Sequence, residues 1–104
     1  MKDQYNFYEK CHKLLCQIPE GKVTTYGEIA KALGSGACRA VGTAMAKNDK
    51  LVIRPCHRVV KSDGRIGEYA LGPKKKEELL KKEGVEVANG RVINFDKYFY
   101  KFSA

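Results

Sequence analysis

Cys56 lies in a short segment that combines the residue types needed for cysteine chemistry. Arg54 and Pro55 precede it, and His57 and Arg58 follow it. A thiolate is the reactive form of cysteine, and nearby positive charge lowers the pKa of a thiol. Pro55 restricts the backbone and so places Cys56 at a defined bend. The pattern favours an activated nucleophile, although a buried, inert thiol is the commoner fate of a single cysteine.

The other cysteines do not extend this segment into a metal site. The chain has four cysteines and two histidines, which form no CxxC pair and no spaced Cys/His cluster. We therefore expect no metal and no cofactor. We expect Cys11, Cys16 and Cys38 to be reduced and to serve only in packing.

The chain has 104 residues and a formal net charge of +8, which is unevenly spread. Residues 35–72 hold seven Lys/Arg against three Asp/Glu. Such charge favours polyanions such as nucleic acid, but solubility alone explains it equally well. An apolar content of 43% fits a globular domain, and no apolar run is long enough to cross a membrane. The polar N-terminus is unlike a signal peptide, so an intracellular protein is expected.

Helical periodicity dominates the first half of the chain. Apolar residues spaced along one face predict a helix over residues 4–17. Thr25 and Glu28 match a capping box, which starts a helix by satisfying its free N–H groups. A glycine-containing break separates this start from a second amphipathic pattern, so residues 25–47 predict a helix-turn-helix. An ordinary helical hairpin in a small core is the alternative.

The second half of the chain changes character. Residues 54–60 form the loop that carries Cys56, and residues 59–67 read as a β-hairpin with Asp63 and Gly64 in its turn. A hairpin that follows a helix-turn-helix is a wing. The predicted fold class is therefore mainly α, a single domain over residues 1–104 with a winged helix-turn-helix and a small β-hairpin wing.

Two further elements complete the predicted domain. Pro73 suits the first turn of a last helix over residues 73–83, which Gly84 ends. The lysines at 74–76 are expected on the solvated face of this helix. The aromatic tail, residues 91–104, is expected to pack against the core as a strand or extended segment.

The segment Pro55-Cys56-His57-Arg58-Val59 resembles the active-site motif of the O6-alkylguanine-DNA alkyltransferases. Further segments match that family in the same order, and the resemblance runs from about residue 5 to residue 87. They are residues 18–26, residues 37–45, Asn48, residues 67–69 and residues 82–84. The chain thus resembles the C-terminal catalytic and DNA-binding domain of the family. Family members commonly carry an N-terminal domain as well, so the chain is either a free-standing catalytic domain or a fragment.

The resemblance implies a repair reaction in which an alkyl group moves from O6-alkylguanine in DNA to Cys56. The thioether cannot be hydrolysed, so each molecule acts once. His57 is then similar to the base that takes the thiol proton through a water, and Glu83 to the carboxylate that orients it. Asn48 resembles the residue that braces this network. Tyr26 resembles the acid that protonates the leaving guanine.

The resemblance also implies a partner, which is double-stranded DNA contacted through the minor groove by a monomer. The damaged nucleotide is flipped out, and Arg39 resembles the arginine that fills its place. DNA contacts are expected at Ala37, Ala40, Gly42, Thr25, Tyr26, Arg54 and Arg58. The substrate pocket is expected to involve Val59, Tyr69 and Ala70.

Three departures from the family pattern leave other functions open. Glu68, Ala70 and Arg54 stand where the family usually has other residue types. An alkyltransferase-like protein that binds lesions without efficient transfer is the main alternative, and Cys56 argues against it. A winged-helix transcription regulator would read bases with polar side chains, which the second helix of the helix-turn-helix mostly lacks. A cysteine hydrolase would need an oxyanion hole, for which the sequence has no signal.

Overall fold

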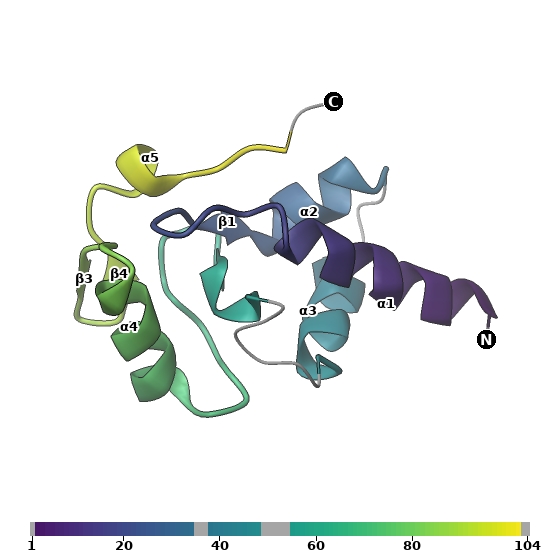
Figure 1. Cartoon of the computed structure of the whole chain (residues 1–104), viewed down its shortest axis with the longest axis horizontal. Helices are drawn as coiled ribbons and strands as arrows, with labels where there is room; N and C mark the ends of the chain where they lie inside the picture. Colours follow the sequence, from purple (N-terminus) through teal and green to yellow (C-terminus); the bar gives the residue numbers. More distant parts are fainter. Residues whose placement is uncertain (1, 35–37, 49–54, 103–104) are drawn as a thin grey trace.

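The computed structural model describes residues 2–34, 38–48 and 55–102. Its elements, in chain order, are five α-helices, a 3-10 helix and four short strands among these residues. They are α1 (Lys2–Leu15), β1 (Thr24–Thr25), α2 (Tyr26–Ala32), α3 (Cys38–Ala46), η1 (Cys56–Arg58), β2 (Val59–Val60), α4 (Pro73–Lys82), β3 (Val87–Ala88), β4 (Arg91–Val92) and α5 (Phe95–Tyr98). The molecule is mostly helical with small sheets, and α1–α3 lie apart from α4, β3 and β4 (Figure 1).

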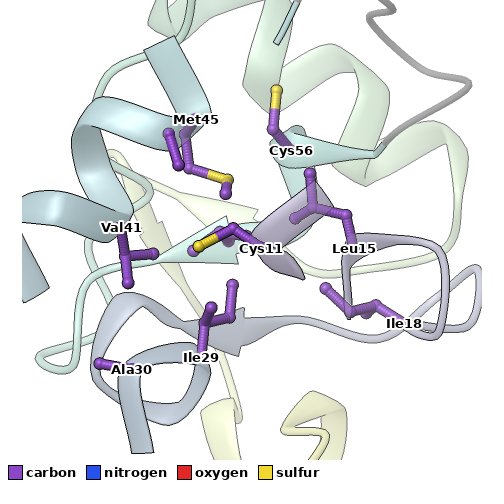
Figure 2. Packing of buried hydrophobic residues seen from close by; sticks show 10 residues of the cluster. Cys11, Leu15, Ile18, Ile29, Ala30, Val41, Met45 and Cys56 are labelled. Atoms are coloured by element: carbon purple, nitrogen blue, oxygen red, sulfur yellow. The ribbon is translucent and has the colours of Figure 1, made fainter. Parts of the chain in front are cut away.

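The first half of the molecule is built on α1, α2 and α3. Cys11 and Leu15 lie one turn apart on α1, and Val41 and Ala44 lie at similar spacing on α3, so each helix presents one apolar face. These side chains are fully buried and pack together (Figure 2). His12 adds a polar contact, because its Nε2 donates to the Ala44 carbonyl at 2.7 Å.

The start of α2 follows the predicted cap. Thr25 Oγ1 accepts a hydrogen bond from the Glu28 N–H at 3.0 Å, which satisfies one of the donors left free at the helix start. Gly34 ends the helix region with a φ of +72°, a conformation that glycine adopts readily. α2 and α3 then contact each other, as a helix-turn-helix requires.

The predicted hairpin over residues 59–67 does not form as two paired strands. β2 pairs instead in parallel with β1, with Thr24 opposite Val59 and Thr25 opposite Val60. A tight turn follows β2, closed where the Lys61 N–H donates to the Arg65 carbonyl at 2.8 Å. The predicted turn at Asp63 and Gly64 thus forms, but β2 takes a distant segment as its strand partner. Among the described residues, 59–67 therefore do not form the two paired strands of the expected wing.

The second half of the molecule is built on α4 and the antiparallel pair β3–β4. Its core is a separate cluster of buried residues, which are Val23, Val60, Ile66, Leu80, Val85, Val87, Val92 and Tyr98. α4 is not the last helix as predicted, because α5 follows it. Beyond α5 the tail is extended and returns to the first half, where the Tyr100 N–H donates to the Val23 carbonyl at 2.8 Å.

The segment from Cys56 to Val60 joins the two halves. Cys56 and Val59 pack in the core of the first half, whereas Val60 packs in the core of the second. In the part of the chain that is described, no helix is long and apolar enough to cross a membrane.

Candidate active site

Cys56 begins a single 3-10 turn, which fixes its position between the two halves. Pro55 precedes the turn with a φ of −76°, and the Arg58 N–H closes it on the Pro55 carbonyl at 3.0 Å. Cys56 is only 6% exposed. Its sulfur points away from Leu15 and Cys11, the neighbouring side chains of the apolar cluster (Figure 2). The thiol therefore stands at the edge of the core.

A pocket of about 860 Å³ opens over Cys56. Its size is within the range of pockets that enclose small ligands. Residues from α2, α3, η1 and the loop before α4 line it, namely Tyr26, Arg39, Gly42, Thr43, Met45, Ala46, Cys56, Lys61, Glu68, Tyr69 and Ala70. Five of these were not predicted as site residues: Thr43, Met45, Ala46, Lys61 and Glu68. Lys61 could have been found from strand alternation, since its neighbour Val60 is buried on the other side.

The structure brings His57 and Glu83 together, although the two residues are far apart in the chain. His57 is fully buried, and its Nε2 donates to Glu83 Oε2 at 2.9 Å. Burial lowers the pKa of His57, and the hydrogen bond and negative charge of Glu83 only partly oppose this. The imidazole is therefore neutral near pH 7. With its proton on Nε2, the ring keeps a lone pair on Nδ1.

Two buried polar atoms close to the pocket have no hydrogen-bond partner among the described residues. They are Nδ1 of His57 and the hydroxyl of Tyr69. The two rings meet edge to face with centroids 6.4 Å apart. Buried polar atoms are nearly always satisfied, so both atoms are suited to a bound water or a substrate.

Arg58 was expected to contact DNA, and the structure gives it a different role. Its Nε and Nη2 donate to the two oxygens of Glu83 at 2.9 and 2.6 Å, and its Nη1 donates to the Ile18 carbonyl at 2.7 Å. Burial alone would raise the pKa of Glu83, but the hydrogen bonds from Arg58 and His57 lower it overall. Arg58 thus keeps Glu83 ionised beside His57.

Several groups act on the thiol of Cys56. Burial raises its pKa, whereas a hydrogen bond from the Asn48 side chain and the charge of Lys76 lower it. Asn48 is buried just after the end of α3. Burial raises the pKa of Tyr26, and the negative charge of nearby Cys56 raises it further. Tyr26 therefore stays protonated and available as a donor.

Lys76 is the largest departure from the predicted site. It was expected on the solvated face of α4, but its side chain is fully buried. Its Nζ donates to the carbonyls of Val59 at 2.7 Å and Glu68 at 3.2 Å. Helical spacing is the signal that could have found it, because residue 76 shares a face with Leu80 and Glu83.

The predicted DNA-contact residues fall into three groups. Arg39 and Gly42 line the pocket from α3. Arg39 is exposed, and Ala40, on the same helix, is partly buried. Thr25 is buried with its hydroxyl in the α2 cap, which leaves little of its side chain for DNA. Ala37 and Arg54 lie outside the described residues.

Val59, Tyr69 and Ala70 were predicted for the substrate pocket. Tyr69 and Ala70 line it, whereas the Val59 side chain is fully buried and only its backbone faces Lys76. No group of three or more possible metal ligands occurs among the side chains that the structure describes.

Comparison with known families gives one match over most of the chain. The sequence model of "6-O-methylguanine DNA methyltransferase, DNA binding domain" matches residues 6–85. The sequence is 42% identical over 99 residues to a bifunctional methyltransferase/endonuclease of Picrophilus torridus, covering 94% of this chain and 32% of that protein. It is 48% identical over 83 residues to a methylated-DNA–protein-cysteine methyltransferase of Saccharolobus islandicus, covering 80% of this chain and 54% of that protein. The chain thus spans about a third to a half of these relatives.

Among solved structures, the fold is similar to that of S. pombe Atl1, which was crystallised with damaged DNA containing O6-carboxymethylguanine. The TM-score is 0.82 at 37% sequence identity, and the match covers 92% of this chain and 95% of Atl1. The similarity therefore extends over nearly the whole of both chains.

Proposed function

The chain belongs to the 6-O-methylguanine DNA methyltransferase family, in which it matches the DNA-binding domain, and we propose that it repairs DNA by moving an alkyl group from O6-alkylguanine to Cys56. In this proposal residues 1–104 form one unit that both binds DNA and carries out the transfer. It corresponds to the C-terminal catalytic domain of longer relatives.

One observation carries the proposal. The only described cysteine that lines the pocket is Cys56, and the residue next to it is hydrogen-bonded to a buried carboxylate. In this proposal Cys56 is the nucleophile, His57 the base, and Glu83 the carboxylate that orients His57 through their hydrogen bond.

The transfer is a displacement at the alkyl carbon. The thiol proton of Cys56 passes through a water to Nδ1 of His57, which Glu83 holds in the required orientation. The sulfur then forms a bond to the alkyl carbon while the bond from that carbon to O6 breaks. The electron pair stays with guanine, which takes a proton from the Tyr26 hydroxyl. The products are a thioether on the protein and an unmodified guanine.

The flanking helices position the DNA in this proposal. α3 enters the minor groove, where its small residues allow a close approach and Arg39 fills the space of the flipped nucleotide. The flipped base enters the pocket between Tyr26 and Tyr69, both of which line it. One copy of the chain suffices, because all of the proposed groups come from one molecule.

A second function is favoured by the similarity to S. pombe Atl1 along nearly the full length of both chains. In that case the protein binds the lesion and transfers the alkyl group poorly or not at all. The exposed Glu68 at the pocket wall does not separate the two functions, because a carboxylate there repels the phosphates of DNA in both.

Intact mass measurement after incubation with an oligonucleotide containing O6-methylguanine separates the two functions. We expect wild-type protein to gain one methyl group, and peptide mapping to place it on Cys56. The Cys56→Ser variant should stay unmodified while still binding the oligonucleotide. An unchanged wild-type mass together with tight lesion binding would support the second function instead.

A further inference from the structure

Lys76 is a buried cation next to two residues that line the pocket, Glu68 and Tyr26, and the proposed mechanism gives it no role. It lies in the second turn of α4 and is 0% exposed. Besides its bonds to the Val59 and Glu68 carbonyls, its Nζ lies 6.0 Å from the centroid of the Tyr26 ring. A lysine is rarely buried without a partner, because moving an ammonium group out of water is costly.

Among the titratable groups around Lys76, Cys56 is the one that can supply a negative counter-charge. Lys61 and His57 face it from the segments after and before β2, and neither can supply negative charge. Tyr26 faces it from α2 but stays protonated, since burial raises the Tyr26 pKa. Cys56 faces it from η1 and becomes negative as a thiolate. Glu83, on the helix of Lys76 itself, is bonded to Arg58 and His57.

We propose that Lys76 is a positioning residue of the alkyl-transfer site, which ties together the two backbone segments flanking the pocket and favours the thiolate of Cys56. This inference rests on the proposed function of Cys56 as acceptor. The bond to Val59 holds the segment that follows Cys56, and the bond to Glu68 holds the loop that carries Tyr69 and Ala70. One ammonium group thereby fixes the distance between the nucleophile and the opposite wall.

The pKa shifts agree with this geometry. Burial lowers the pKa of Lys76 to about 8, although the charge of Cys56 acts in the opposite direction. Burial raises the pKa of Cys56 overall, and the charge of Lys76 partly opposes this rise. This coupling is reciprocal, since each charge must favour the other by the same free energy.

The first test compares Lys76→Met with the matched control Lys75→Met, which removes an exposed lysine from the same helix. Iodoacetamide labelling of Cys56 is followed by peptide mapping across a range of pH. The labelling rate of Lys76→Met near neutral pH should fall about tenfold, because the loss of a close positive charge raises the thiol pKa by about one unit. Lys75→Met should match wild type. A folded Lys76→Met with a wild-type pH profile overturns the proposal.

The second test uses the unmutated lysine, so it does not depend on the folding of a variant. The pKa of Lys76 is measured by NMR of its Cε carbon in Cys16→Ser protein, before and after carbamidomethylation of Cys56. The thioether has no charge, so the pKa of Lys76 should fall after modification. An unchanged Lys76 pKa overturns the proposal.

Methyl transfer provides the link to function. The transfer rate of Lys76→Met should fall at least as far as its labelling rate, and Lys76→Arg should recover part of the loss. Neither labelling nor NMR involves DNA, so a protein that transfers no methyl group would refute the proposed function and still give a separate answer for Lys76. A normal transfer rate in Lys76→Met would refute the role of Lys76 alone.

Discussion

Cys11 and Cys56 are both buried thiols in the same apolar cluster, yet their surroundings differ in kind. Cys11 is 0% exposed, and burial raises its pKa to about 11. Cys56 is 6% exposed, and polar groups oppose the effect of burial on its pKa. The difference lies in the neighbours, since Cys11 faces aliphatic side chains whereas Cys56 has Asn48 and Lys76 beside it.

This difference follows from the position of each cysteine relative to the two halves of the molecule. Cys11 is inside the first half, where α1 and α3 bury apolar faces against each other. Cys56 is at the junction, where the second half contributes Lys76 and Glu83 from α4 and its end. Charged groups are tolerated there because each has partners. The thiol of Cys56 therefore lies where an apolar core meets a polar network.

The largest expected effect is on methyl transfer, when Cys56 and Cys11 are replaced by serine in two separate variants. Cys56→Ser should abolish methyl transfer, because a serine hydroxyl is a weak nucleophile without a strong base. Cys11→Ser should still transfer one methyl group per molecule. Intact mass after incubation with an O6-methylguanine oligonucleotide measures both. Transfer by Cys56→Ser, or its loss in folded Cys11→Ser, would remove the distinction between the two cysteines.

Glu83→Gln tests the polar network that distinguishes the junction. The variant leaves Arg58 without its counter-charge and His57 without a carboxylate, so the transfer rate should fall about a hundredfold. The free energy of unfolding should fall by about 3 kcal/mol, because a buried cation loses its partner. Single-turnover kinetics and urea denaturation measure the two effects.

Glu77→Gln is the matched control for that experiment. Glu77 lies on α4 and pairs with Lys81 at 2.9 Å, but this pair is largely exposed. Exposed pairs contribute less than about 1 kcal/mol, so stability and transfer should both stay close to wild type. Equal losses in the two variants would mean that the network at the junction has no special role.

Cys11→Ser also has a stability effect, which is smaller. A hydroxyl placed in an apolar core without a partner costs about 2 kcal/mol. The transfer rate per folded molecule should stay unchanged, since Cys11 does not line the pocket. Cys16→Ser is the control, because Cys16 is exposed and its substitution should change stability by less than about 0.5 kcal/mol. Urea denaturation of the three proteins gives the comparison.

The sequence predicted the apolar half more completely than the junction. The cap at Thr25 and the apolar faces of α1 and α3 follow from local spacing, which tertiary contacts do not override. Val59 and Val60 were predicted as a strand of a local hairpin, but the pairing was wrong, because their partner β1 lies far away in the chain. Local patterns thus predict an element and leave its pairing open.

The proposed site shows the same division. The resemblance to a family pointed to His57 and Glu83, and the structure brings them within hydrogen-bond distance. Arg58 was expected among the DNA contacts, and nothing local in the sequence indicates that its nitrogens bind Glu83 and Ile18. Lys76 was missed for the same reason, since lysines are almost never fully buried. In both cases the hydrogen-bond partners of the side chain come from segments that are distant in the chain.

The smallest expected effect is a change in the pH dependence of the free energy of unfolding, and it comes from His57 at the junction of the two halves. Burial lowers the pKa of His57 below 6.5, so the unfolded chain binds a proton more readily than the folded protein. The contribution of His57 is fully present above pH 6.5, and the free energy of unfolding falls as the pH drops below that value. His57→Gln should flatten this slope between about pH 6.5 and 5. Cys11→Ser should lower stability but keep the wild-type slope, so thermal melts across this range separate a titrating junction from a non-titrating core. A His57→Gln protein with the wild-type slope would show that burial of the imidazole does not couple the junction to pH.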